Sequence, residues 1–320
     1  MDEKQGEIKV TVICSAYNHE KYIRDALDGF VSQKANFKFE VIVHDDASTD
    51  NTPNIIREYE KKYPDIIKPI YQSENQFRLG VNIYYKFVLP ISHGEFIAQC
   101  EGDDYWTDPL KLQEQYDYMV AHPNCSLVVH NTERIYMGSG RKKAFLSKSF
   151  DNSGNCEFTA EEVIKDHMLF HTSAMFFRKE FSLKNKDFML NHAAYDYLLK
   201  CLLATEGEVH YIPKIMSVYR MGTAGSWTQS TSESSEKYIH HNEVAIKAME
   251  DLNDYHSFKY NDIIQKNILD RKFRILLRQR DYTSIMTEPY LSIYKGLALK
   301  SKLKIWMGKT FPKLYDRIFS

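Results

Sequence analysis

The stretch that most constrains the fold is residues 96–106, where an apolar run ends abruptly in Glu-Gly-Asp-Asp. The run is rich in Phe and Ile and predicts a buried strand. Adjacent carboxylates at a strand end repel each other, so they are costly unless a cation lies on them. A divalent metal carrying phosphates would supply that cation, because Mg²⁺ and Mn²⁺ bind one or two carboxylates together with substrate phosphates. The alternative is an acidic turn before a helix, since Thr107, Asp108 and Pro109 resemble a helix start.

Strand and helix patterns alternate in the first part of the chain. Residues 7–14 are β-branched and almost continuously apolar, which predicts a strand covered on both faces, as in a parallel sheet. Further strands are expected at 39–43, 66–71 and 96–100, with helices at 22–31, 52–59 and 82–88 between them. This order predicts an α/β fold with a doubly wound, mostly parallel sheet flanked by helices.

Polar clusters follow three of these predicted strands. They are Ser15 with Tyr17, Asp45 with Asp46, and Asp103 with Asp104. In doubly wound sheets, ligands bind beyond the carboxyl ends of the strands, where the strand order switches. Three polar clusters at equivalent positions on one rim favour a binding site over an isolated acidic turn.

Composition excludes several classes of function. The net charge of −1 gives no reason to expect a nucleic-acid partner. No apolar run approaches the ~18 residues of a membrane span, and residues 1–5 lack the apolar core of a signal peptide. The five cysteines are scattered and show neither metal spacing nor a disulfide framework, so reduced thiols in a cytoplasmic protein are expected.

The second half begins with mixed elements and ends in charged helices. We expect helices at 109–121 and 195–206, strands at 125–130, 171–178, 209–212 and 216–219, a loop or β-excursion at 134–155, a capping box at 159–162, and a flexible stretch at 221–229. From about Ser230 two heavily charged helices follow, at 231–258 and 262–280. The sequence therefore predicts an α/β domain at 1–229 and a helical C-terminal region at 230–320.

The end of the chain alternates cations with apolar residues and is interrupted by one acid, Asp316. Its cations are Lys295, Lys300, Lys302, Lys304, Lys309, Lys313 and Arg317. That composition is typical of a basic amphipathic segment on an anionic membrane surface, here the inner face of the cell membrane. The alternative is a helical subdomain that packs on the core or on another subunit as a homo-oligomer contact.

Taken together, the ordered motifs resemble a family 2 glycosyltransferase of the GT-A fold, of a bacterial surface-glycan or polysaccharide type. The motifs are residues 15–20, 45–50, 101–106, 171–173 and 195–197, then 218–220 with Trp227. Each motif alone is weak, but their order along about two thirds of the chain is specific. The region after Ser230 is not covered by the resemblance.

The resemblance implies a role for each matching residue. Ser15 and Tyr17 would hold the nucleotide, and Asp46 would accept a hydrogen bond from its base. Asp103 would touch the ribose or the donor sugar, and Asp104 would hold Mn²⁺ or Mg²⁺ against the diphosphate. Asp196 would be the catalytic base, and His171, Thr172 and Ser173 would line the donor and acceptor pocket.

The implied reaction explains these residue types. Transfer from a nucleotide sugar, here a UDP-sugar, needs the leaving diphosphate neutralised, which a metal does as a Lewis acid. It also needs the acceptor hydroxyl of a glycan, lipid-linked or protein-bound acceptor to lose its proton, and a positioned carboxylate takes it. A single in-line displacement inverts the anomeric centre.

Two positions depart from the family pattern. Many relatives carry a His soon after the Tyr-Arg pair that completes the metal site, but residues 221–225 contain no His here. The residue before Asp196 is Tyr195, where an acid or Gly is often found. The first departure leaves the third metal ligand open, and the second weakens the assignment of the base.

Two other functions fit part of the pattern. A sugar nucleotidyltransferase usually has a Gly-rich, basic phosphate loop after the first strand, but residues 15–20 contain no glycine. A non-catalytic GT-A module that binds a nucleotide sugar would not need the Asp103 and Asp104 pair together with Asp196. The sequence therefore favours an inverting, metal-dependent glycosyltransferase of the hexosyltransferase type.

Overall fold

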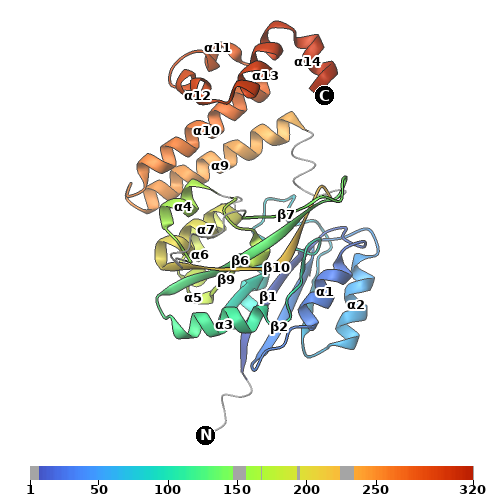
Figure 1. Ribbon diagram of the computed structural model, residues 1–320. Coiled ribbons are helices and arrows are strands. Elements are labelled where there is room, and N and C mark those ends of the chain that lie inside the picture. Colours follow the sequence, from blue (N-terminus) through green and yellow to red (C-terminus); the bar gives the residue numbers. More distant parts are fainter. Residues whose placement is uncertain (1–6, 147–155, 167, 193–194, 224–233, 320) are drawn as a thin grey trace. The chain divides into compact units, whose positions relative to one another are not determined.

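The computed structural model describes residues 7–146, 156–166, 168–192, 195–223 and 234–319, and divides the chain into two compact units, Met1–Gly225 and Ser226–Ser320 (Figure 1). The first unit is a mixed α/β structure, and the second is helical. The expected flexible stretch with Trp227 and the expected change of character near Ser230 fall largely within residues 224–233, outside the described residues.

One large sheet forms the centre of the first unit. Its strands are β1 (Ile8–Ala16), β2 (Lys38–Asp45), β3 (Ile67–Tyr71), β4 (Phe96–Gln99), β5 (Tyr105–Trp106), β6 (Cys125–Tyr136), β9 (Phe176–Arg178) and β10 (Glu208–Met221). Their order across the sheet is β3-β2-β1-β4-β9-β6-β10-β5. Two short strands join at the side: β7 (Lys142–Ala144) pairs with β6, and β8 (Glu157–Phe158) pairs with β10.

The pairing confirms a mostly parallel, doubly wound sheet. Strands β3, β2, β1 and β4 are parallel, as are β6 and β10. The exception in the middle is β9, which runs antiparallel to both of its neighbours, β4 and β6. The central strands β1, β2 and β4 are almost wholly buried, which explains their continuous apolar sequences.

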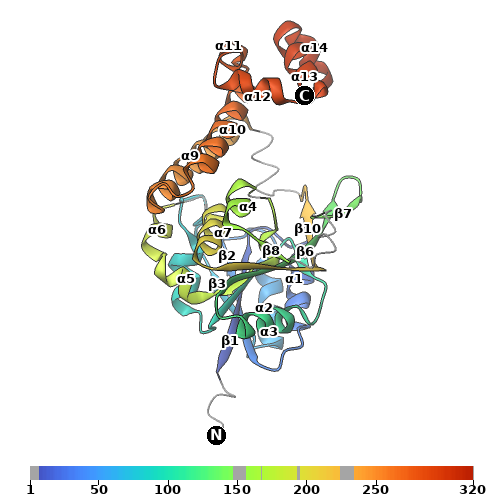
Figure 2. The same ribbon diagram turned by 60° about the vertical axis from the view of Figure 1, so that its left-hand side comes forward.

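Helices cover the sheet. They are α1 (Ile23–Val31), α2 (Thr52–Lys62), the π-helix η2 (Tyr84–Val88), the 3₁₀ turn η3 (Leu89–Ile91), α3 (Lys111–Ala121), α4 (Ala160–Lys165), α5 (Lys179–Lys184), α6 (Lys186–Leu190) and α7 (Tyr195–Glu206). Side chains of α1, α2 and α3 share one hydrophobic cluster with the sheet, including Phe30, Ile56 and Leu112. Figure 2 shows α3 on one side of β6 and β10, and α4 and α7 on the other.

Some local expectations were wrong, each for a physical reason. Residues 171–178 are not one strand: His171 accepts a hydrogen bond from the Ser173 backbone and starts the 3₁₀ turn η4 (Thr172–Ala174), so β9 begins only at Phe176. The two strands expected at 209–212 and 216–219 are one strand, β10, because β6 pairs with it across register shifts.

Other local expectations were confirmed or extended. The capping box of α4 is present, because Thr159 and Glu162 exchange backbone and side-chain hydrogen bonds. Part of the expected 134–155 excursion is the β6–β7 hairpin, and residues 147–155 lie outside the described residues. Helix α2 begins at Thr52, as expected, and the Thr52 hydroxyl accepts a hydrogen bond from the His19 backbone amide at 2.8 Å.

The second unit contains α9 (Ser235–Tyr255), α10 (Asn261–Gln279), α11 (Tyr282–Ile285), α12 (Tyr290–Gly296), α13 (Leu299–Thr310) and α14 (Pro312–Phe319). Helices α9 and α10 pack together, and a small core of Phe273, Ile285 and Ile305 joins α10, α11 and α13. Among the described helices, none combines the length and the apolar character that crossing a membrane requires.

We expect acid sensitivity at His210 of β10, whose ring stacks on that of Tyr118 with centroids 3.5 Å apart. Burial, and then the neighbouring His122, lower the pKa of His210 from 6.5 to about 4. The unfolded chain therefore binds this proton first as the pH falls. The stabilisation from neutral His210 is complete above pH 6.5 and is lost toward pH 4, by up to about 1.4 kcal/mol per pH unit.

Urea unfolding across this pH range measures the effect. His210→Gln is expected to flatten the dependence of the free energy of unfolding on pH, because glutamine does not titrate. Equal pH profiles for wild type and His210→Gln would contradict the assignment.

Candidate functional site

The ends of β1, β2 and β4 meet at one rim of the sheet, as the sequence predicted. The backbone amide of Asp46 donates to Ala16, and that of Gly102 donates to Ser15, both at 2.9 Å. A Cβ on Gly102 would lie 2.8 Å from Ile23 Cδ1 and 2.9 Å from His19 Nδ1. Glycine at this position therefore lets the acidic loop after β4 pack closely against the loop after β1.

Ser15 and Tyr17 lie in this rim as predicted, and the loop after Tyr17 is locked to the loop after β2. Asn18 adopts a positive φ of 56°, its side chain accepts the Thr49 amide at 2.8 Å, and its own amide donates to the Ser48 hydroxyl. Tyr17 is partly buried, and the Arg78 guanidinium lies over its ring, 5.3 Å from the centroid.

Asp45 and Asp46, adjacent in sequence, have different surroundings. The Asp46 carboxylate accepts the backbone amides of Gln76 at 2.7 Å and Phe77 at 3.1 Å, and so anchors the loop after β3. Asp45 Oδ1 is buried and has no hydrogen-bond partner within the described part of the chain. Burial raises the pKa of Asp45. The sequence singled out Asp46, whereas the unsatisfied acceptor belongs to Asp45.

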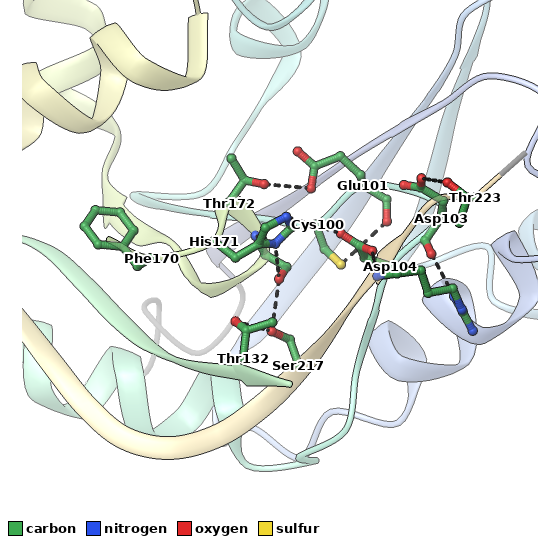
Figure 3. A network of polar contacts seen from close by, with 12 residues as sticks. Cys100, Glu101, Asp103, Asp104, Thr132, Phe170, His171, Thr172, Ser217 and Thr223 are labelled. Atoms are coloured by element: carbon green, nitrogen blue, oxygen red, sulfur yellow. Dashed lines mark hydrogen bonds and ion pairs between the residues drawn. The ribbon is translucent and has the colours of Figure 1, made fainter. Parts of the chain in front are cut away.

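Three carboxylates cluster in the loop after β4 (Figure 3). Glu101 accepts the Thr172 hydroxyl at 2.9 Å, and Asp103 accepts the Thr223 hydroxyl at 3.0 Å. Asp104 is only 1% exposed, and its Oδ1 accepts the backbone amide of Arg220 at 2.9 Å. The Asp104 side chain is therefore held from β10, and Oδ2 is the oxygen turned toward the other polar groups.

Arg220 is the main cation at the cluster. Its guanidinium pairs with Asp25 of α1, donates to the backbone oxygen of Asp103 at 2.8 Å, and lies over the Tyr105 ring. This one side chain ties α1, the acidic loop and β10 together. Arg220 does not neutralise the cluster, because burial raises the pKa of both Glu101 and Asp104, and neighbouring carboxylates raise them further.

His171 faces the cluster from η4. Its Nε2 lies 3.7 Å from Asp104 Oδ2, and its ring stacks on Tyr219 with centroids 4.1 Å apart. Its Nδ1 is 3.2 Å from the Ser173 backbone amide, which can only donate. Nδ1 is therefore the acceptor, Nε2 carries the hydrogen, and burial keeps the ring neutral by lowering its pKa.

Ligand atoms of Glu101, Asp104 and His171 all lie within 4.8 Å of one another. Two carboxylates fit Mn²⁺ or Mg²⁺, which prefer oxygen ligands. Burial raises the pKa of both groups, so a bound cation would stabilise their charged forms. His171 Nε2 carries a hydrogen and lies 3.7 Å from Asp104 Oδ2, beyond hydrogen-bond distance, so in this tautomer the ring lines the cluster without being a ligand. Glu101 and Asp104 are therefore the residues here that could hold a metal.

Asp196, the predicted base, lies in the first turn of α7 and is exposed. Its charge raises the pKa of Glu101, so the structure brings these two carboxylates near each other although 95 positions separate them. Loss of solvation beside the surrounding protein raises the pKa of the Asp196 carboxyl, and the ammonium group of Lys200 opposes the rise. Lys200, one turn further along α7, is buried and donates to the backbone oxygen of Phe170 at 2.9 Å.

Glu101, Lys200 and Arg220 had no individual role among the sequence-based predictions, and Thr172 was expected only to line the donor and acceptor pocket. The position of Lys200 four residues after Asp196 is a helical spacing that signals a shared face. Glu101 belongs to the motif at residues 101–106. Its position three residues before Asp104 is only a weak indication that the two carboxylates share a site. Thr172 and Arg220 contact residues that are far away in the sequence, so no local sequence pattern indicates these contacts.

Comparison of the sequence with known proteins assigns the chain to a protein family. The family model for glycosyl transferase family 2 matches residues 11–185. An uncharacterized protein of Mycobacterium tuberculosis is 35% identical over 246 residues, which cover 76% of this chain and 68% of the relative. The chain belongs to glycosyl transferase family 2 and is a glycosyltransferase.

Solved structures share the fold. TarS 1-349 of S. aureus, crystallised with UDP-GlcNAc, matches with a TM-score of 0.61 and 19% identity over 94% of this chain and 79% of that one. The mannosyltransferase PcManGT of Pyrobaculum calidifontis, in complex with GDP-Man and Mn²⁺, matches with a TM-score of 0.52 and 17% identity over 89% of this chain and 83% of that one. The first unit therefore has the GT-A fold.

Proposed function

We propose that this glycosyltransferase moves a sugar from a nucleotide-diphosphate donor, a UDP-sugar, to a hydroxyl of a glycan, lipid-linked or protein-bound acceptor, with inversion and with a divalent metal. The observation that carries the proposal is the convergence of Glu101, Asp104 and His171 on one rim, with Asp196 close to Glu101. TarS with UDP-GlcNAc and PcManGT with GDP-Man and Mn²⁺ support a nucleotide-sugar donor and a metal.

The donor would lie along the rim formed by the ends of β1, β2 and β4. Ser15 and Tyr17 would hold the nucleotide, and Asp46 or its neighbour Asp45 would accept the hydrogen on the base. The free, buried Oδ1 of Asp45 makes the pair, rather than Asp46 alone, the proposed contact. Asp103, whose side chain is more exposed than that of Asp104, would contact the ribose or the sugar.

The metal would be held by Asp104 Oδ2 with Glu101, and when bound it neutralises the leaving diphosphate. The Arg220 amide holds the Asp104 carboxylate, and His171 would line the donor pocket beside it. Asp196 accepts the proton of the acceptor hydroxyl as the new glycosidic bond forms and the diphosphate leaves. Its exposed position at a helix start gives an acceptor access.

A donor panel tests the proposed function. Purified protein is incubated with UDP-, GDP- and dTDP-sugars, each with Mn²⁺, with Mg²⁺ or with a chelator, and release of the nucleoside diphosphate is measured. We expect one donor, a UDP-sugar, to be turned over only when metal is present. Turnover that persists with the chelator would contradict metal dependence, and absence of turnover with every donor would contradict the proposed reaction.

A further inference from the structure

The last two helices of the second unit expose an apolar stripe. It consists of Leu299, Leu303, Trp306, Phe311, Leu314 and Ile318. On α13 the spacing of Leu299, Leu303 and Trp306 places them on one helical face. Leu299 is 81% exposed and Trp306 50%. The Trp306 and Phe311 rings meet with centroids 5.6 Å apart and so connect this face to the apolar residues of α14.

This stripe is not the face that stabilises the unit. Ile305 and Gly308 of α13 are buried, and Ile305 packs in the small core with Phe273 and Ile285. Helix α13 therefore already has an inward face, and the stripe is a second apolar surface. Large contiguous exposed apolar surfaces mark sites that bind another molecule or a membrane.

The charge around the stripe identifies what it binds. Residues 299–319 contain six basic residues and one acidic residue, a net charge of +5 in a chain whose net charge is −1. The basic residues are Lys300, Lys302, Lys304, Lys309, Lys313 and Arg317. A second copy of the same surface would bring like charges together, so self-association through the stripe is disfavoured. An anionic partner that also accepts apolar side chains fits better.

We propose that α13 and α14 attach the protein to the surface of a bilayer that contains anionic lipids. The stripe enters the boundary between headgroups and acyl chains, with Trp306 at the level that its amphipathic ring prefers. The lysines and Arg317 lie among the anionic headgroups. Neither helix needs to cross the bilayer. This inference is independent of the proposed reaction, because lipid binding requires neither donor nor metal.

Vesicle cosedimentation of the full chain tests the attachment. One set of vesicles is phosphatidylcholine alone, and the other contains equal parts of phosphatidylcholine and phosphatidylglycerol. We expect binding to the anionic vesicles only, and weaker binding at high salt. Replacing Lys300, Lys302 and Lys304 with Gln is expected to weaken binding on the order of a hundredfold or more. Trp306→Ser is expected to weaken it at both low and high salt.

Matched controls keep the test specific. Lys34, Lys61 and Lys165, all exposed in the first unit, are replaced with Gln, and exposed Leu183 is replaced with Ser. These variants are expected to bind like wild type, and thermal unfolding verifies that every variant is folded. Equal binding to both kinds of vesicle, or unchanged binding of the α13 variants, would overturn the proposal. So would concentration-dependent dimerisation without vesicle binding, or binding to an acidic polypeptide alone.

Discussion

Asp196→Asn is expected to lower the rate of sugar transfer by about 10²–10⁴-fold while donor affinity stays close to that of wild type. The substitution removes the group proposed to take the acceptor proton, but it keeps the size of the side chain and its place in the first turn of α7. Because Asp196 is not proposed to touch the nucleotide, calorimetric titration of the donor is expected to show no large change. Single-turnover measurements with the donor identified in the panel give the rate.

A structural role of Asp196 makes a different prediction. A carboxylate in the first turn of a helix is stabilised by the helix dipole, so its loss would lower thermal stability and leave the rate nearly unchanged. Asp187→Asn is the matched control, because Asp187 is also an exposed acid in the first turn of a helix, α6. Equal rates for the Asp196 and Asp187 variants would remove Asp196 from the mechanism and leave the fold assignment intact.

Asp104→Asn is expected to weaken Mn²⁺ binding at least about 10- to 100-fold, with Glu101→Gln next in effect. Asp104 Oδ1 already accepts the Arg220 amide, so the substitution affects Oδ2, the oxygen proposed to hold the metal. Electron paramagnetic resonance of free Mn²⁺, recorded with and without UDP, measures the affinity directly and does not depend on activity.

Asp103→Asn distinguishes the role of Asp103 from that of the adjacent Asp104. Its carboxylate accepts the Thr223 hydroxyl and is more exposed than that of Asp104. We expect this variant to bind Mn²⁺ almost as wild type does and to lose donor affinity. If Asp103→Asn abolishes Mn²⁺ binding and Asp104→Asn does not, the metal rests on Asp103, and Asp104 is a buried structural group that holds β10.

Much of the first unit was predictable because burial on both faces leaves a continuous apolar run in the sequence. This holds for β1, β2 and β4, and the polar residues after each of them do share one rim. The central reversed strand β9 was not predictable in this way. Its three residues are too few to show a period, and the polar turn before it was mistaken for more strand because Ala174 and Met175 are apolar and buried.

The candidate site was predictable as a set of motifs but not as a set of contacts. Asp103, Asp104 and Asp196 follow from motif order, yet nothing local indicates that Glu101 lies near Asp196 or that His171 faces Asp104. These contacts depend on how β4, η4 and α7 are brought together by the sheet. Sequence patterns report the neighbours of a residue along its own element, and this site is assembled from several elements.

Three buried hydroxyl groups form a hydrogen-bonded row that ends at the His171 ring. Thr132 and Ser217, then Ser217 and Ser173, lie 2.9 Å apart, and Ser173 lies 2.8 Å from Nδ1 (Figure 3). Each hydroxyl has one hydrogen, so when Ser173 donates to the ring, the row satisfies every member only if all its hydrogens point the same way. Turning His171 into a metal ligand would reverse the whole row. The buried row of hydroxyl groups is thereby coupled to the choice of which ring nitrogen of His171 carries the hydrogen.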